Sequence, residues 1–217
     1  MADPNSRAGA RYDAPEILSF VQRAHVRHDP ALQRAFDAPA ANSMPAIQVG
    51  PSEGKLLGLL IGMIGARNVV EVGTLAGYST IWLGRALPDD GQLYSIEIDA
   101  GRAAIARANI EAAGLAARAE VLIGPGAEVL ERLSSRAPFD ALFLDADKGG
   151  YAGYGRWAAA NLRPGGLLLA DNAYLFGELL TEREDAPAMR RFHEELPKAF
   201  ESVCIPTPDG LVLGVRR

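Results

Sequence analysis

The sequence has 217 residues and a single cysteine, Cys204. One cysteine excludes an intramolecular disulfide and any metal cluster held by several thiolates, and it favours a reducing compartment. Lysine is almost as scarce: the only lysines are Lys55, Lys148 and Lys198, whereas there are 19 arginines. The composition is otherwise that of a globular protein, with 48% hydrophobic and 23% charged residues.

No hydrophobic run is long enough to predict a membrane span. The uncharged apolar stretch Leu56–Ala66 has 11 residues and contains three glycines, whereas a span needs about 20 residues. The first residues lack the apolar region of a secretory signal. The net charge of −5 argues against binding nucleic acid through phosphate neutralisation. We therefore predict a cytoplasmic protein with neither membrane nor nucleic acid among its partners.

Short apolar runs alternate with helical stretches from residue 67 onward, which is typical of a parallel sheet covered on both faces. The predicted strands of this part are Asn68–Val72, Gln92–Glu97, Ala119–Ile123, Phe139–Leu144 and Gly166–Ala170. The helices between them are Tyr78–Ala86, Gly101–Ala113, Ala127–Ser134 and Tyr151–Leu162. This pattern predicts a doubly wound, Rossmann-like α/β fold.

The two ends of the chain add a helical cap and a hairpin to this core. Helices are predicted at Ala14–Arg27, Pro30–Phe36 and Pro51–Gly65, with a lid-like loop at Asp37–Gly50. A further helix is predicted at Ala186–Leu196, before an antiparallel hairpin formed by Glu201–Ile205 and Leu211–Val215. The hairpin brings the sheet to seven strands. We predict one domain over residues 1–217, with cap and loop at 1–50 and the cofactor-binding core at 51–217.

The loop after the first strand has the composition of a ligand-binding turn. Gly73 and Gly77 let the backbone approach a ligand, and the helix that follows offers free N–H groups. The spacing is not the G-x-G-x-x-G of dinucleotide-binding proteins, which speaks against a dehydrogenase. Glu97 ends the second strand, where a carboxylate can accept both hydroxyls of a ribose. These features favour an adenosine-containing ligand.

Oxygen donors follow the fourth and fifth strands. Asp145, Asp171 and Asn172 stand where parallel strands open onto the same crevice, and such hard donors suit Mg²⁺ or a similar cation. Lys148 lies three residues after Asp145. In a chain that so strongly prefers arginine, a lysine here suggests proton transfer, which arginine cannot perform.

Taken together, these motifs resemble the cation-dependent class I O-methyltransferases, the group that contains catechol and caffeoyl-CoA O-methyltransferases. The similarity runs from Gln48-Val49-Gly50-Pro51 through EVGTLAGYST, SIEID, FLDADK and LLLADN to PDGLVLG, about 170 residues. It implies S-adenosylmethionine as methyl donor, Mg²⁺ as metal and a small, catechol-like hydroxylated acceptor. It also suggests a homodimer.

The resemblance assigns roles residue by residue. Val49, Glu71, Gly73, Thr74 and Ser79 would line the methionine half of the donor, and Glu97 would hold the ribose. Ile98 and the turn Gly124-Pro125-Gly126-Ala127 would border the adenine. Asp145, Asp171 and Asn172 match the metal ligands, and Lys148 matches the general base, with Asp145 beside it in the catalytic site.

Two regions bear on which acceptor the protein would bind. The late glutamate that binds the second catechol hydroxyl has no clear counterpart in Ile205–Asp209. The bulky loop Ala173–Gly177 is predicted to form part of the acceptor pocket.

Alternative functions remain at this stage. The acceptor could be a hydroxyl on coenzyme A or an acyl carrier protein, whose phosphates Arg7, Arg11, Arg23 and Arg27 would meet. The chain could instead bind S-adenosylmethionine without catalysis, although the intact set of Asp145, Lys148, Asp171 and Asn172 speaks against that.

Overall fold

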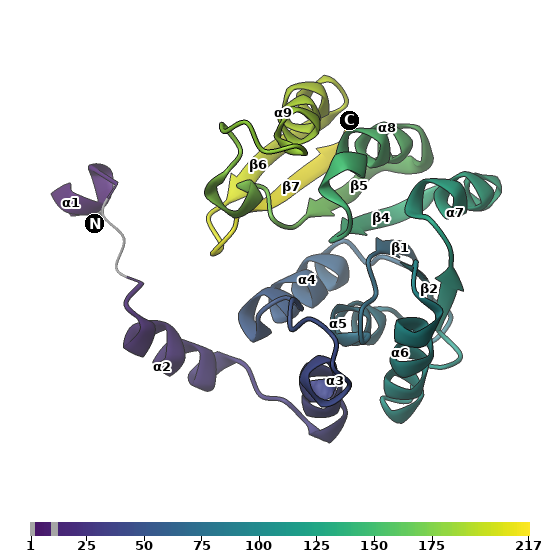
Figure 1. The fold of residues 1–217 in the computed structure, drawn as a ribbon. Helices are drawn as coiled ribbons and strands as arrows, with labels where there is room; N and C mark the ends of the chain where they lie inside the picture. The colour runs from purple at the N-terminus through teal and green to yellow at the C-terminus, as the bar shows by residue number, and fades with distance from the viewer. Residues whose placement is uncertain (1–2, 10–12) are drawn as a thin grey trace.

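The computed structural model describes residues 3–9 and 13–217 and is built around a seven-stranded sheet in the order β3-β2-β1-β4-β5-β7-β6 (Figure 1). Strands β1 to β5 are parallel, and β7 pairs antiparallel with both β5 and β6. The strands are β1 Asn68–Val72, β2 Gln92–Glu97, β3 Ala119–Ile123, β4 Phe139–Leu144, β5 Leu162–Ala170, β6 Phe200–Ile205 and β7 Leu211–Arg216. The predicted fold class is confirmed.

Helices cover both faces of this sheet, with α7, α8 and α9 on one side and α4, α5 and α6 on the other (Figure 1). Their bounds are α4 Pro51–Met63, α5 Tyr78–Ala86, α6 Ala100–Ala112, α7 Gly126–Leu133, α8 Tyr151–Asn161 and α9 Ala186–Glu195. Side chains of β1 alternate between the two cores, with Val70 and Val72 in one and Val69 in the other. Burial on both faces explains the continuous apolar strands.

The N-terminal cap consists of α1 (Pro4–Arg7), α2 (Pro15–His25) and α3 (Pro30–Ala41). The helix α3 packs beside α5 and α6, whereas α1 and α2 extend away from the body of the molecule (Figure 1). Arg11, one of the four arginines considered above for a carrier, lies outside the described residues. No helix in the described part of the chain combines the length and apolar character needed to cross a bilayer.

The largest difference from a predicted boundary is at the end of α3. The loop was predicted to begin at Asp37, but α3 continues to Ala41 through Pro39. The alanines around Pro39 are strong helix formers, and Ala35, Ala38 and Pro39 are buried against the body. Proline lacks the N–H that would donate a helical hydrogen bond. Because Pro39 lies in the last turn of α3, only a bond near the end of the helix is lost. Only residues 42–50 form the loop.

Candidate active site

A cleft of about 710 Å³ opens at the carboxyl ends of β1, β2 and β4, where ligands bind in open α/β sheets. Most of the predicted site residues line it. They are Val49, Gly73, Thr74, Ser79, Glu97, Ile98, Pro125, Gly126, Ala127, Asp145, Lys148 and Asn172. The structure thus brings residues from six separate segments of the chain to one cavity, while the role of each stays a prediction.

The loop after β1 passes closely over the end of β4. Gly73 has φ +102, and a Cβ there would lie 2.7 Å from the carbonyl carbon of Asp145. Gly77, with φ +84, forms the left-handed turn before α5. The glycines are therefore required by backbone conformation at both positions and by close approach at Gly73.

Glu71 is not among the residues that line the cleft, and its predicted place at the methionine half stays a prediction. Its side chain is fully buried beneath the loop and accepts hydrogen bonds of 2.5 Å from the hydroxyls of Ser79, Thr80 and Ser95. Burial raises the pKa of Glu71 to about 7, against the opposing effect of these donors. One of these donors, Ser79, lines the cavity, so Glu71 contacts the site through a hydrogen bond to that residue.

Glu97 is buried at the end of β2 and is held by the backbone. One carboxylate oxygen accepts from the N–H of Leu75 at 2.8 Å, and the other accepts from the N–H of Asp99 at 3.0 Å. A carboxylate has about four acceptor positions, so each oxygen keeps a lone pair for a ligand in the cleft. This geometry suits two adjacent hydroxyls.

The adenine side of the predicted cofactor site begins at Ile98 and continues to the start of α7. The apolar side chain of Ile98 is largely exposed at the cleft, so it is free to pack against a flat ligand. A Cβ on Gly126 would lie 2.7 Å from Tyr154 Oη and 2.9 Å from Val72 Cγ1. Glycine here keeps the N-terminus of α7 close to the cleft floor.

The acidic residues meet Lys148 at the other end of the cleft. Lys148 Nζ lies 3.1 Å from Asp145 Oδ1 and 2.8 Å from Tyr151 Oη, and the Tyr151 hydroxyl contacts the carbonyl oxygen of Asp171 at 3.1 Å. Burial, followed by the charge of Asp145, raises the pKa of Asp171 to about 7. A cation bound between two carboxylates that repel each other in this way would stabilise their charged forms.

The donor set fits a hard divalent cation. Asp145 and Asn172 line the cleft and Asp171 is buried beside them, so Asp171 is the second predicted residue that does not face the cavity directly. Asn172 adopts φ +57, which asparagine tolerates better than most residues. Within residues 3–9 and 13–217, no three His, Cys, Asp or Glu side chains converge. A cation would therefore depend on two carboxylates, one amide and oxygens from ligands or water.

Several residues without a predicted role also line the cleft, among them Gln48, Tyr78 and Arg102. The Nε2 of Gln48 donates to the Phe36 carbonyl at 2.9 Å, while its Oε1 is buried without a partner in the described structure. Its place beside Val49 in the motif Gln48-Val49-Gly50-Pro51 was a signal that could have found it. Phe176 also lines the cleft, and it lies in the loop Ala173–Gly177 that is predicted to form part of the acceptor pocket.

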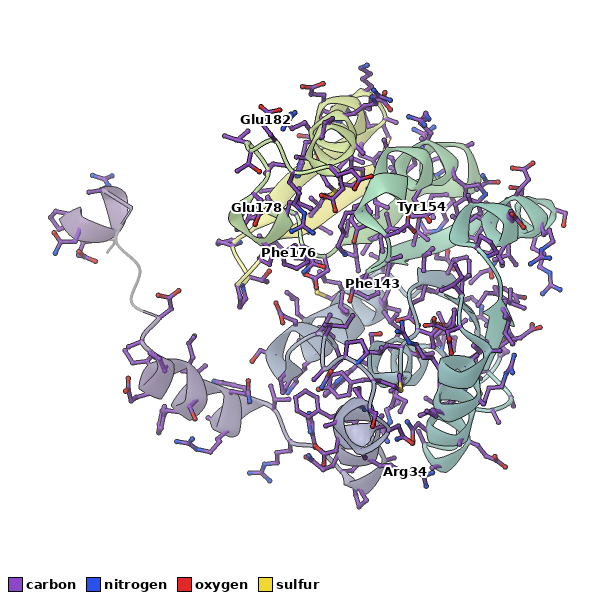
Figure 2. All side chains as sticks on the ribbon, in the orientation of Figure 1. Arg34, Phe143, Tyr154, Phe176, Glu178 and Glu182 are labelled. Carbon is purple, nitrogen blue, oxygen red and sulfur yellow. The ribbon has the colours of Figure 1, made fainter. Side chains whose placement is uncertain are left out.

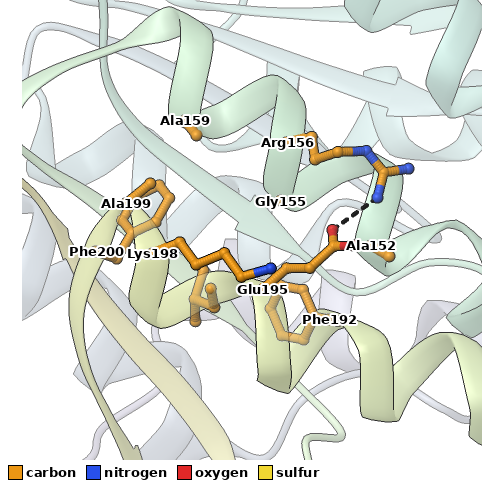
Figure 3. A pocket seen from close by; sticks show the side chains of 10 residues that line it. Ala152, Gly155, Arg156, Ala159, Phe192, Glu195, Lys198, Ala199 and Phe200 are labelled. Atoms are coloured by element: carbon orange, nitrogen blue, oxygen red, sulfur yellow. Dashed lines mark hydrogen bonds and ion pairs between the residues drawn. The ribbon is translucent and has the colours of Figure 1, made fainter.

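A second, smaller cavity of about 310 Å³ lies between α8 and α9 and contains none of the predicted site residues. It is lined mainly by apolar side chains such as Phe192 and Phe200, and an ion pair of 2.8 Å joins Arg156 to Glu195 at its rim (Figure 3). Glu97, Asp145, Lys148 and Asn172 all line the larger cleft instead.

The strand order separates this chain from dinucleotide-binding dehydrogenases, whose sheets run 3-2-1-4-5-6. Here the antiparallel β7 is inserted between β5 and β6. Fold and site together define a Rossmann-like protein whose cleft combines the carboxylate of Glu97 with an acidic, lysine-containing end.

Comparisons with known proteins agree with this class. The O-methyltransferase family model matches residues 22–217. A catechol O-methyltransferase of Niastella koreensis is 44% identical over 199 residues, covering 86% of this chain and 90% of that protein. Caffeoyl-CoA O-methyltransferase 2 of Petunia hybrida is 34% identical over 177 residues, covering 74% of this chain and 73% of the relative. The structure of an O-methyltransferase from Bacillus cereus in complex with SAH has a TM-score of 0.89 and 34% identity, over 93% of this chain and 97% of that one.

The chain belongs to the O-methyltransferase family. It is an enzyme of that class, and the dehydrogenase and non-catalytic alternatives are set aside.

Proposed function

We propose that the protein transfers the methyl group of S-adenosylmethionine to a hydroxyl of a small, catechol-like acceptor, with Mg²⁺ or a similar cation at Asp145, Asp171 and Asn172. The observation that carries the proposal is a single cleft that joins the Glu97 carboxylate and glycine loop to the Lys148 and Asp145 pair. The SAH complex of the Bacillus cereus neighbour supports the donor, since SAH is what S-adenosylmethionine becomes on losing its methyl group. The catechol O-methyltransferases among the relatives support the acceptor.

The donor would lie along the loop after β1. Glu97 would accept the ribose hydroxyls through its remaining lone pairs, while Ile98, Pro125, Gly126 and Ala127 would border the adenine. The methionine half would then extend past Gly73 and Ser79 toward Asp145. This direction would place the sulfonium methyl near the acidic end.

The acceptor oxygen needs to lose a proton before it attacks. A phenol has a pKa near ~10 and is a poor nucleophile at neutral pH, and a divalent cation, when bound, would lower that pKa. Lys148 would take the proton at Nζ, where Tyr151 and Asp145 hold the amine in place. The oxygen would then form its bond to the methyl carbon in line as the carbon–sulfur bond breaks. Such alignment is worth effective molarities of about 10⁵–10⁸ M.

An acceptor screen with isotopically labelled S-adenosylmethionine tests this proposal. The panel contains catechol, phenol, an aliphatic vicinal diol and a catechol thioester of coenzyme A, each with Mg²⁺, with EDTA, and with Mg²⁺ restored after EDTA. We expect labelled product from catechol, loss of activity in EDTA and recovery with Mg²⁺. Full activity in EDTA would refute the metal role, and labelling of the thioester alone would move the acceptor to a carrier.

Calorimetry distinguishes the donor independently of the acceptor. S-adenosylmethionine should bind and NAD should not. The reverse would refute the assignment of the cleft.

We also propose that the protein forms a homodimer through the N-terminal helices. Ile17, Leu18, Phe20 and Val21 of α2 are between 46% and 67% exposed, which is a costly apolar face for an isolated helix. A second copy would cover it.

Light scattering should give the mass of a dimer, and Phe20→Glu should shift it to the monomer, with Glu16→Gln as a control. A monomeric wild-type protein at micromolar concentration would contradict this.

A further inference from the structure

The segment that follows β5 has an unusual backbone. Asn172, Leu175 and Phe176 adopt φ of +57, +52 and +57, so three of five consecutive residues lie in the left-handed region without being glycine. Leucine and phenylalanine gain nothing locally from this conformation. Such strain persists only where neighbouring structure imposes it, and it is concentrated at functional sites.

The turn between β6 and β7 imposes this conformation. Asp209 Oδ1 accepts from the N–H of Phe176 at 2.9 Å, and the Asp209 carbonyl accepts from the N–H of Tyr174 at 2.9 Å. The Gly210 carbonyl accepts from the N–H of Ala173 at 2.9 Å. Three hydrogen bonds therefore tie the segment to a turn that is more than 30 residues away in sequence. Of the three, only the bond to Phe176 uses a side chain.

The ring of Phe176 is held at the cleft. It lines the same cavity as Lys148 and Asn172 and remains 56% exposed. The guanidinium carbon of Arg183 lies 5.2 Å from its centroid, and Arg183 is itself paired with Asp185 at 2.7 Å and Glu178 at 3.7 Å. Figure 2 shows Phe176 and Glu178 in the segment beside the C-terminal hairpin. An exposed phenylalanine fixed on its backbone side and flanked by a guanidinium is a preorganised aromatic surface.

We propose that Phe176 is the wall against which an aromatic acceptor packs, and that Asp209 is a positioning residue that holds Phe176 in place. The inference rests on the proposed function and narrows it to planar aromatic acceptors with adjacent oxygens, in preference to aliphatic diols. A flat ring gains from offset or edge contact with Phe176, whereas a saturated diol offers no π face. Asp209 acts at a distance from the reacting atoms, through the backbone of Phe176.

Three variants test the arrangement: Phe176→Ala, Asp209→Ala and Asp209→Asn. The asparagine keeps an oxygen that can accept the Phe176 N–H, whereas alanine removes it. We expect Phe176→Ala and Asp209→Ala each to raise KM for catechol roughly three- to tenfold, as the loss of one aromatic contact would. The dissociation constant for S-adenosylmethionine should stay within twofold, and Asp209→Asn should resemble the wild type. The double variant Phe176→Ala/Asp209→Ala should be no worse than Phe176→Ala alone.

Hydrogen exchange of the Phe176 amide provides a readout that does not depend on activity. The amide should be protected in the wild type and in Asp209→Asn, and unprotected in Asp209→Ala. Equal exchange in all three would overturn the proposal, as would an unchanged KM in Phe176→Ala or additive effects in the double variant. If the wild type methylates no catechol, the proposed function fails while the exchange experiment still decides the role of Asp209.

Discussion

The variant Gly73→Ala tests whether the cleft depends on the close approach of the loop after β1 to the end of β4. A Cβ at this position would lie 2.7 Å from the carbonyl carbon of Asp145 and closer still to its oxygen. Carbon atoms pack at about 3.5–4.0 Å, so the two segments must part by about 1 Å. They have little freedom to do so, because the N–H of Asp145 bonds to the Val72 carbonyl and the N–H of Gly73 to the Ile96 carbonyl, both at 2.9 Å.

The cost has two parts, overlap and backbone conformation. Overpacking costs about 1–3 kcal/mol, and an alanine at φ +102 adds about 1–2 kcal/mol. We therefore expect urea unfolding to give a midpoint lowered by the equivalent of roughly 2–5 kcal/mol, with an unchanged m value. A displacement of about 1 Å at Asp145 should also lower kcat/KM for catechol roughly 100-fold.

Gly62→Ala is the matched control. Gly62 lies on α4, has no positive φ, and a Cβ there would meet no atom within 4 Å. Alanine is favoured over glycine in a helix by up to about 1 kcal/mol, so this variant should be neutral or slightly more stable and fully active. If Gly73→Ala behaved like Gly62→Ala in both assays, the argument from close approach would be refuted.

Three further predictions concern single carboxylates and the lysine. Because the pKa of Glu71 rises from 4.5 to about 7 in the folded state, its contribution to stability is complete below pH 4.5 and is lost as pH rises through 7, by about 3 kcal/mol in total. Glu71→Gln should remove that part of the pH dependence in urea unfolding at pH 5 to 8, and an identical slope in both proteins would contradict the burial argument. Lys148→Met should lower turnover by about 10²–10⁴-fold with S-adenosylmethionine affinity nearly unchanged, and an unaltered rate would exclude it as the base. Glu97→Gln should weaken S-adenosylmethionine binding about tenfold by calorimetry, and wild-type affinity would remove the ribose role.

Local sequence patterns were sufficient for most of the elements. Mainly apolar runs place β1 to β4 with the observed bounds, because β1, β2 and β4 lie inside the sheet and are buried on both faces, while β3 at the edge alternates between buried and exposed residues. The exceptions depend on contacts between distant segments. The helix α3 extends past Pro39 because its last turn packs on the body, and β5 begins at Leu162, four residues before the predicted Gly166, where its pairing with β4 is irregular.

The sequence by itself determined which residues stand at strand ends, and parallel strands bring their carboxyl ends to one edge. That is why Gly73, Glu97, Asp145 and Asn172 could be expected to share a cleft. Only the tertiary structure decided that Glu71 is buried beneath the loop, since its three hydroxyl partners come from α5 and β2. The same holds for Phe176, whose backbone is set by Asp209 from the far end of the chain. A periodic pattern encodes which face a side chain occupies, whereas hydrogen bonds between remote loops leave no period in the sequence.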